Sequence, residues 1–325
     1  MPDYMKQTES PEESIQKAFG RKKTIKSTGI MLYPYSAERE LVRLMWAQLK
    51  IVRDVYNKYL PEIERIYNEN RLNTDGVRYD TKILQFSERF SRTIRKMEKE
   101  IAKRVEDFDT ETFMKKVAQR AKSNNIREWK RLIKRTFGID LDGNYYNKGT
   151  YNFMIDSWVA DNVKSIKGLT EEQWPTMKNI IMEGYFNGDS ITKIKNQIVK
   201  QFGKDKRHAR QIAVDQVGSL NAQITRYQQQ KAGCDKYWWC AVMDNRTRES
   251  HAFFHGKIYS WDAPPMGWYR TKHGIVYTRA CHPGEDYGCR CVAMPVFEVN
   301  SVMIPIEQQK HPKIMPLKKK TTKKK

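Results

Sequence analysis

The residues best suited to chemistry gather near the C-terminus, between Asp244 and Cys291, which holds three of the five cysteines and four of the six histidines. Thiolates and imidazoles are the ligands that zinc prefers in proteins. Cys289 and Cys291, one residue apart, together with His251 and His282 therefore predict a Cys2His2 structural zinc site. The alternative is that the two cysteines pack as small hydrophobic residues and no cofactor is bound.

One further cysteine and one further histidine complete the set of possible ligands. Cys281 and His255 lie close enough in sequence to serve as reserve zinc ligands. Cys234 and Cys240 lie outside this set, and we expect them to be buried structural residues.

A second chemistry uses acid, base and phosphate-binding groups. Asp244, Arg248 and His251 would suit a nuclease-like enzyme, with a carboxylate, a phosphate ligand and a proton carrier. The structural alternative is that Asp244 caps a helix, that Arg246 and Arg248 form internal salt bridges, and that His251 anchors the following loop. We favour this alternative and expect no enzymatic activity, because no second general base or oxyanion-stabilising group accompanies the three residues.

Long amphipathic helices precede this segment. Apolar residues recur at three- and four-residue steps over about 36–60, 82–104 and 111–134. Pro61 is expected to start a new segment. Shorter helices are expected over 151–164, 170–184, 190–202 and 207–231, with breaks at Gly168, Gly188 and Gly203 and a terminal glycine at Gly233.

The sequence pattern changes after Gly233, where short apolar runs alternate with Pro- and Gly-rich stretches. Strands are expected over 237–243, 257–260 and 291–297. The fold class is therefore mainly α with a small C-terminal α+β domain, an elongated helical arm followed by a loop-rich compact domain. The expected boundaries are a disordered basic tail at 1–30, a helical arm at 31–205, the compact domain at 206–300 and a second basic tail at 301–325.

The charge balance points to a polyanionic partner. The chain carries 60 Lys and Arg against 38 Asp and Glu, a formal net charge of +22. Nucleic acid is the first candidate and an anionic membrane surface the second. No window is apolar enough for a membrane span, no secretory signal is visible, and the odd cysteine number fits a reducing cytoplasm. The residues expected to contact DNA are Lys318, Lys319, Lys320, Lys323, Lys324 and Lys325.

Several of these residues also carry a family resemblance. They are Trp239, Asp244, Arg246, Thr247, Arg248 and His251 in the segment DNRTRESH, Gly256, Pro264, Pro265, and His282, Pro283, Cys289, Arg290, Cys291 and Pro295. Over about 182–296 the sequence resembles the C-terminal domain of the phage minor head protein family, also called head morphogenesis or phage Mu F-like. Val214, Asp215 and Gln216 stand where that family usually has Arg-Thr-Glu.

The resemblance implies a structural role in a virion. Such proteins are minor head components encoded beside the portal protein, and they enter the procapsid and lie inside the head near the portal. The implied partners are the portal protein, other procapsid components and double-stranded phage DNA, with assembly in the host cytoplasm and roles in head morphogenesis, DNA packaging or ejection. A nuclease-like enzyme and a general DNA-binding protein unrelated to virions remain the alternatives.

Overall fold

The computed structural model describes residues 24–72, 79–138, 148–187 and 189–298. The predicted DNA-contacting lysines between 318 and 325 lie outside these residues, as do most of the two predicted tails. The chain divides into two compact units. We call Ser36–Ala118 with Asp156–Ala213 the helical unit, and Met1–Tyr35, Gln119–Ile155 and Val214–Lys325 the mixed unit.

Long helices dominate the chain, which confirms the predicted mainly α fold class. They are α2 (Tyr35–Leu72), α3 (Tyr79–Glu106), α4 (Thr110–Phe137), α5 (Lys148–Phe186) and α6 (Ile191–Lys231). A short helix, α7 (Glu249–Phe254), follows in the mixed unit. In the part of the chain that the structure describes, none of the helices is both long enough and apolar enough to cross a membrane.

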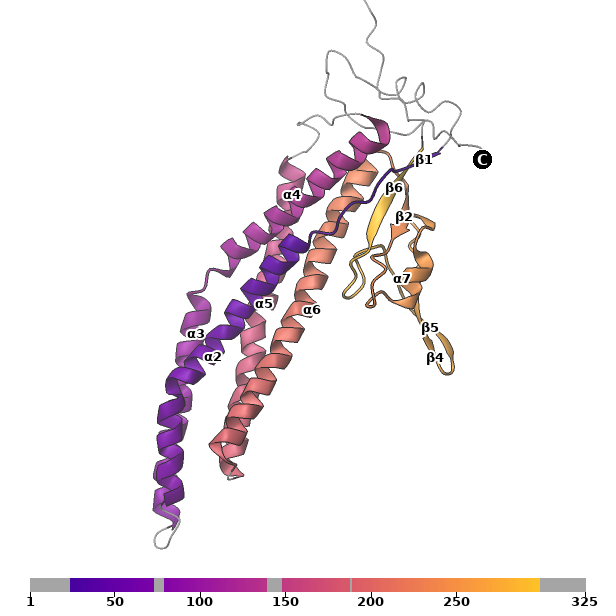
Figure 1. Cartoon of the computed structure of the whole chain (residues 1–325). Coiled ribbons are helices and arrows are strands. Elements are labelled where there is room, and N and C mark those ends of the chain that lie inside the picture. The colour runs from indigo at the N-terminus through magenta and orange to yellow at the C-terminus, as the bar shows by residue number, and fades with distance from the viewer. Residues whose placement is uncertain (1–23, 73–78, 139–147, 188, 299–325) are drawn as a thin grey trace, which may run out of the picture. The chain divides into compact units, whose positions relative to one another are not determined.

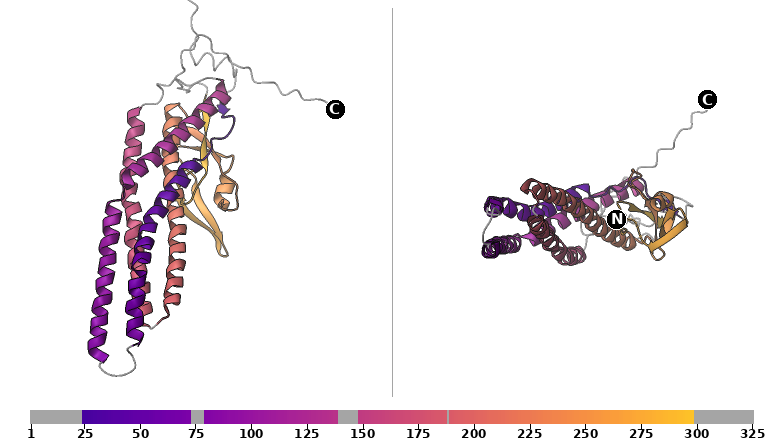
Figure 2. Two further views of the ribbon diagram at one scale, coloured as in Figure 1. Left: turned by 60° about the vertical axis from the view of Figure 1, so that its left-hand side comes forward. Right: turned by 90° about the horizontal axis from the view of Figure 1, so that it is seen from below.

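In the helical unit, α2 and α3 form an antiparallel pair (Figures 1 and 2). Ion pairs and hydrogen bonds fix the register. Lys58 lies 2.7 Å from Glu100 near one end, and Arg89 lies 2.7 Å from Glu69 near the other. Between them, Thr93 donates to the Glu62 carboxylate at 2.9 Å. The first part of α4, the second part of α5 and the first part of α6 complete this unit.

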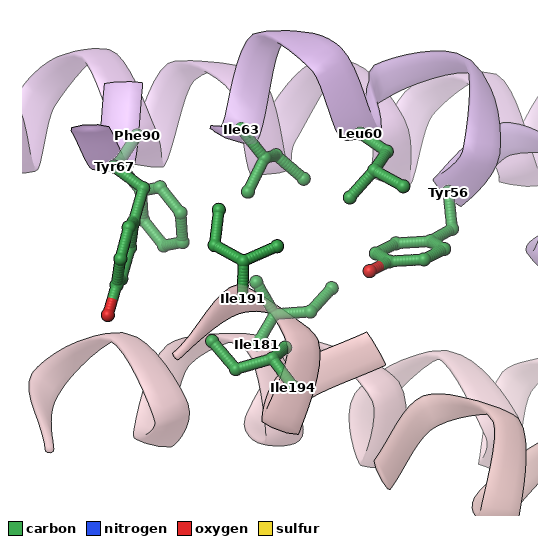
Figure 3. Close-up of a pocket in the computed structure, with 8 residues that line it drawn as sticks. All are labelled: Tyr56, Leu60, Ile63, Tyr67, Phe90, Ile181, Ile191 and Ile194. Carbon is green, nitrogen blue, oxygen red and sulfur yellow. The ribbon is translucent and has the colours of Figure 1, made fainter. Parts of the chain in front are cut away.

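The core of the helical unit is apolar. It contains Val52, Val55, Tyr56, Ile63, Ile66, Phe90, Ile94, Met97, Ile101, Trp174, Met177, Ile181, Ile194 and Ile198. These residues follow the helical spacing seen in the sequence. A cavity of about 20 Å³ remains among Tyr56, Tyr67, Phe90 and neighbouring isoleucines (Figure 3), far below the ~300–1,000 Å³ of a typical ligand site.

Three predicted helix breaks are wrong. α2 continues through Pro61, α5 continues through Gly168, and α6 continues through Gly203. A glycine inside a helix costs only ~1 kcal/mol, so a strongly buried apolar face outweighs it. The break near Gly188 is present, because α5 ends at Phe186 and α6 begins at Ile191.

The mixed unit contains a four-stranded antiparallel sheet with the strand order β1-β6-β2-β3. Its strands are β1 (Thr24–Lys26), β6 (Val292–Glu298), β2 (Lys236–Cys240) and β3 (Ile258–Ser260). β2, β3 and β6 confirm the predicted strands. β1 comes from the segment predicted to be an N-terminal tail, and it pairs Thr24 with Glu298.

A two-stranded hairpin was not predicted from the sequence. It consists of β4 (Met266–Thr271) and β5 (Gly274–Ala280), and β4 contacts α7 (Figure 1). Many Pro and Gly residues flank the hairpin, and such residues are typical of loops. The sequence therefore predicted loops where the two strands lie. Every residue of β5 is exposed, so burial imposes no alternation of apolar and polar residues along this strand.

The two faces of the four-stranded sheet pack differently. One face contacts the C-terminal part of α4, where the Phe137 and Phe297 rings lie 4.7 Å apart in edge contact. The other face buries Tyr237 and Trp239 with α7 and the loop before β6. Successive strand residues therefore point to opposite sides, as a half-buried strand requires.

Candidate functional site

The segment between β2 and α7 forms a tight turn organised by Asp244. The Asp244 carboxylate accepts from the Arg246 backbone at 3.1 Å and from the Thr247 hydroxyl at 3.3 Å. The helix itself is preceded by Arg248 as N-cap, without a side-chain capping bond. The expectation that Asp244 caps this helix is therefore wrong, because its oxygens are used within the turn and by Arg290.

Arg290 ties this turn to the C-x-C segment. Its guanidinium is almost fully buried and donates to Asp244 Oδ2 at 2.6 Å. This contact lowers the pKa of Asp244 to about 2, because the ionised carboxylate is stabilised by the guanidinium. Arg290 stands between Cys289 and Cys291, so its anchoring also fixes the backbone that carries both thiols.

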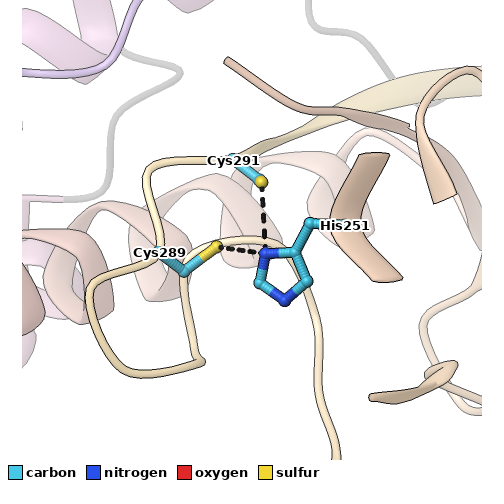
Figure 4. A group of neighbouring side chains, drawn as sticks. All are labelled: His251, Cys289 and Cys291. Carbon is cyan, nitrogen blue, oxygen red and sulfur yellow. Dashed lines mark hydrogen bonds between the residues drawn. The ribbon is translucent and has the colours of Figure 1, made fainter. Parts of the chain in front are cut away.

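Three of the four predicted zinc ligands meet in the interior. The Nδ1 atom of His251, on α7, lies 3.6 Å from Cys289 Sγ and 3.6 Å from Cys291 Sγ (Figure 4). Each of the three residues is at most 5% exposed. The three ligand atoms all lie within 4.8 Å of one another.

Asp286 lies on the other side of the histidine ring. Its Oδ2 atom is 3.3 Å from His251 Nε2 and 3.2 Å from Arg248 Nη1. Arg279 approaches the second oxygen at 3.6 Å. Arg248 and His251 therefore converge on one carboxylate. Sequence reasoning did not single out Asp286, since an aspartate in a turn carries no distinguishing signal.

His282, the fourth predicted ligand, is not brought into this group. Its Nδ1 atom lies 2.9 Å from the Tyr237 hydroxyl, and its backbone N–H donates to Glu285 at 2.8 Å. The reserve candidate His255 accepts from the Ala241 backbone at 3.1 Å. Cys281 does join His251 and Asp286 in a second group whose ligand atoms lie within 4.8 Å of one another.

The two cysteines expected to be structural are buried away from these ligands. Cys234 and Cys240 belong to the cluster between the sheet and α4. Burial raises the pKa of the Cys240 thiol, as expected for a group with no charge partner.

Glycines allow the ligand-bearing loop to approach α6 closely. A Cβ atom on Gly218 would lie 2.9 Å from the Cys289 carbonyl, and one on Gly284 would lie 3.1 Å from the Gly218 carbonyl. Asp215 Oδ1 also accepts from the Gly288 N–H. Gly256, part of the predicted motif, adopts a φ of 77° that favours glycine.

The protonation of the group follows from these contacts. Burial lowers the pKa of His251, but the pairing with Asp286 and the adjacent thiols outweighs it and raises the value to about 11. The same pairing lowers the pKa of Asp286 to about 2. Contact with Cys291 holds the pKa of Cys289 well below its ordinary value. The cluster therefore favours a thiolate beside an imidazolium.

The region that contains this site matches a known protein family. Residues 175–294 match the family model described as phage Mu protein F like protein. An uncharacterized protein of Haemophilus influenzae is 31% identical over 186 residues, which are 57% of this chain and 39% of that protein. No solved structure matches the chain.

A second relative carries a more specific name. The Mu-like prophage FluMu F protein of Haemophilus influenzae is 35% identical over 94 residues, 28% of this chain and 19% of that protein. The chain thus spans about two fifths and one fifth of the lengths of these two relatives. The resemblance predicted from the sequence is confirmed, and residues 175–294 form a phage Mu F-like region.

Proposed function

We propose that this protein is a minor structural component of a phage or prophage head, that it acts beside the portal during head morphogenesis, and that it contacts double-stranded DNA during packaging or ejection. The observation that carries the proposal is the phage Mu F-like region at residues 175–294. The virion interior, the portal and procapsid partners and assembly in the host cytoplasm belong to the same proposal.

The contacts of the candidate catalytic residues support a structural role. His251 is 2% exposed, and each of its ring nitrogens faces an internal group. Asp244 is engaged by Arg290, and Arg248 donates to the Tyr287 carbonyl at 2.5 Å. A general base must reach the proton that it removes from a substrate. These contacts of the three side chains are with groups of the protein itself, which supports a structural role.

The net charge of +22 supports the DNA contacts. Lys and Arg neutralise phosphates and release counterions without reading sequence. The same charge would serve a general DNA-binding protein, so the virion assignment depends on the phage Mu F-like region and not on the charge.

Analysis of purified particles tests the assignment to the head. Mass spectrometry of virions produced by the prophage should identify the chain, together with the portal protein, after removal of unassembled protein. Finding the chain only in the unassembled fraction would contradict the proposal. Co-purification with the portal from a lysate blocked before DNA packaging would support the proposed place beside it.

A binding assay tests the DNA contacts. Deleting residues 311–325 should weaken binding to duplex DNA and reduce the slope of log affinity against log salt by ~0.9 for each phosphate that is no longer neutralised. The matched control replaces Lys318, Lys319, Lys320, Lys323, Lys324 and Lys325 with glutamine, which keeps the length. If both variants bind as the wild type does, these lysines do not contact DNA.

An activity assay separates the nuclease-like alternative. Purified wild-type protein is expected to leave labelled RNA and DNA intact, with and without divalent metal ions. Cleavage that disappears in a correctly folded His251→Gln variant would favour the enzyme, because removing a general acid or base costs ~10²–10⁴ in rate.

A further inference from the structure

We propose that His251 Nδ1, Cys289 Sγ and Cys291 Sγ bind one structural zinc ion, and that Cys281 supplies the fourth ligand. Both sulfurs are directed at the His251 nitrogen (Figure 4), and the three atoms lie within 4.8 Å of one another. This ligand set differs from the one predicted from the sequence, because Cys281 takes the place of His282.

The distances between these atoms fit tetrahedral zinc. With Zn–S near 2.3 Å and Zn–N near 2.0–2.1 Å, tetrahedral angles place the nitrogen and each sulfur ~3.5 Å apart. The structure has 3.6 Å for both His251–cysteine distances. Only small shifts of the two thiols are needed for a metal ion to bind all three atoms.

The opposite ring nitrogen has the partner that a zinc-bound histidine usually has. Metal-binding histidines commonly donate their second N–H to a carboxylate, which orients the ring and selects its tautomer. Asp286 Oδ2 lies 3.3 Å from His251 Nε2 and can take that role. The lone pair on Nδ1 then points between the two sulfurs. Asp286 is thus a positioning residue and not a ligand.

The ionisation and the orientation of the two thiols also suit metal binding. The Gly284 N–H donates to Cys289 Sγ at 3.3 Å, a contact that favours the thiolate. The ion pair between Arg290 and Asp244 holds the residue between the two cysteines, so both thiols turn to the same side. The ligands come from α7 and from the loop before β6, and one ion would join these two segments.

Cys281 is the remaining thiol beside His251. Its side chain is 2% exposed, and its sulfur lies within 4.8 Å of ligand atoms of His251 and Asp286, so it must turn toward Cys289 and Cys291 to complete the set. His282 is less suited because it belongs to neither group of candidate ligand atoms among the described residues. A Cys3His set, closed to solvent, is one of the common structural zinc sites.

Metal content of the full-length chain tests the proposal directly. Protein purified from zinc-supplemented cells and dialysed should retain about one zinc per chain. Cys289→Ser and Cys291→Ser should lose most of it. Cys240→Ser is the matched control, a buried thiol on the opposite sheet face, and should retain it. A metal-free wild type, or equal loss in Cys240→Ser, would overturn the proposal.

Two further variants keep the test independent of misfolding. Asp286→Asn should keep a wild-type circular dichroism spectrum and bind zinc ~10–100-fold more weakly. Unchanged affinity would remove Asp286 from the site. Cobalt-substituted protein should show sulfur-to-cobalt charge-transfer absorption that weakens in Cys281→Ser. Undiminished absorption and affinity in that variant would exclude Cys281 as a ligand. None of these results depends on a role in the virion.

Discussion

The helical unit and the mixed unit differ in where their charged groups lie. In the helical unit the core cluster is hydrophobic, the unit's buried polar residues are mostly uncharged, and charge pairs such as Arg89 with Glu69 are about half exposed. In the mixed unit, Arg290, His251 and His282 are all buried and each has a defined polar partner. A buried charge is costly without its partner, whereas an exposed pair contributes little. Removing one member of a charged pair should therefore lower the free energy of unfolding more in the mixed unit than in the helical unit.

The largest effect is expected at the aromatic residue beneath the ligand group. Trp239 is fully buried, and its ring lies 5.2 Å from His251 and 5.1 Å from Phe254. Trp239→Ala should lower the free energy of unfolding by ~3–5 kcal/mol, measured by urea denaturation. Trp46→Ala, at a site 37% exposed, is the control and should cost about 1 kcal/mol or less. Similar losses in both variants would contradict the packing assigned to Trp239.

A comparable loss is expected in the apolar core of the helical unit. Met177 is fully buried there. Met177→Ala should cost ~2–5 kcal/mol because it leaves a cavity, and Met177→Leu, which conserves volume, should cost less than ~1.5 kcal/mol. Both variants should leave the zinc content unchanged. A loss of zinc in Met177→Ala would show that the ligand group is not stabilised separately from this core.

The sharpest contrast between the units concerns the Asp244–Arg290 pair. Asp244→Asn leaves the buried guanidinium of Arg290 without an anionic partner and should cost ~1–3 kcal/mol, less than for a fully buried pair because Asp244 is 30% exposed. The exposed Asp235→Asn is the control. A loss no greater than that of the control would remove the distinction between the two units.

The pH dependence of stability provides a second test of the Asp244–Arg290 pair. The folded-state pKa of Asp244 is lowered to about 2, so its contribution is present above the unfolded value and is lost as pH falls. The stability difference between wild type and Asp244→Asn should therefore shrink between about pH 4 and pH 2. Denaturation midpoints across this range measure it, and a constant difference would argue against the pairing.

The smallest effect is expected at the surface of the helical unit. Arg89→Gln removes a 2.7 Å contact with Glu69 in which both side chains are nearly half exposed. Solvent screening limits such a pair to ~0–1 kcal/mol. A loss above ~2 kcal/mol would mean that the helical unit also depends on its charge pairs.

The two units also differ in what their sequence reveals. The helices of the helical unit follow the spacing of their apolar residues, so their existence could be predicted. Their continuity through Pro61 and Gly168 could not, because tertiary packing overrides local helix-breaking tendency. The β4–β5 hairpin was hidden because β5 is exposed along its whole length and β4 fully buries only Gly267.

The group of candidate metal ligands could be predicted from the sequence only in part. The C-x-C spacing and His251 indicate a metal site without any knowledge of the fold. The choice between Cys281 and His282, adjacent in sequence, depends on which of them faces His251, and that is set by Tyr237 on a distant strand. The close approach of Gly218 to the Cys289 backbone likewise has no local signal.

The pairing of β1 with β6 has a consequence for how the two ends of the chain can act. Thr24 and Glu298 are direct partners in an antiparallel ladder, so the chain enters β1 and leaves β6 at points ~5 Å apart. Segment 1–23, which ends in the basic run RKK, and the lysine-rich segment 299–325 are thus tethered to one anchor. Once either segment holds a phosphate backbone, the other meets it at a high effective concentration instead of by free diffusion. Two weak contacts with DNA would then act together as one bivalent interaction of higher affinity.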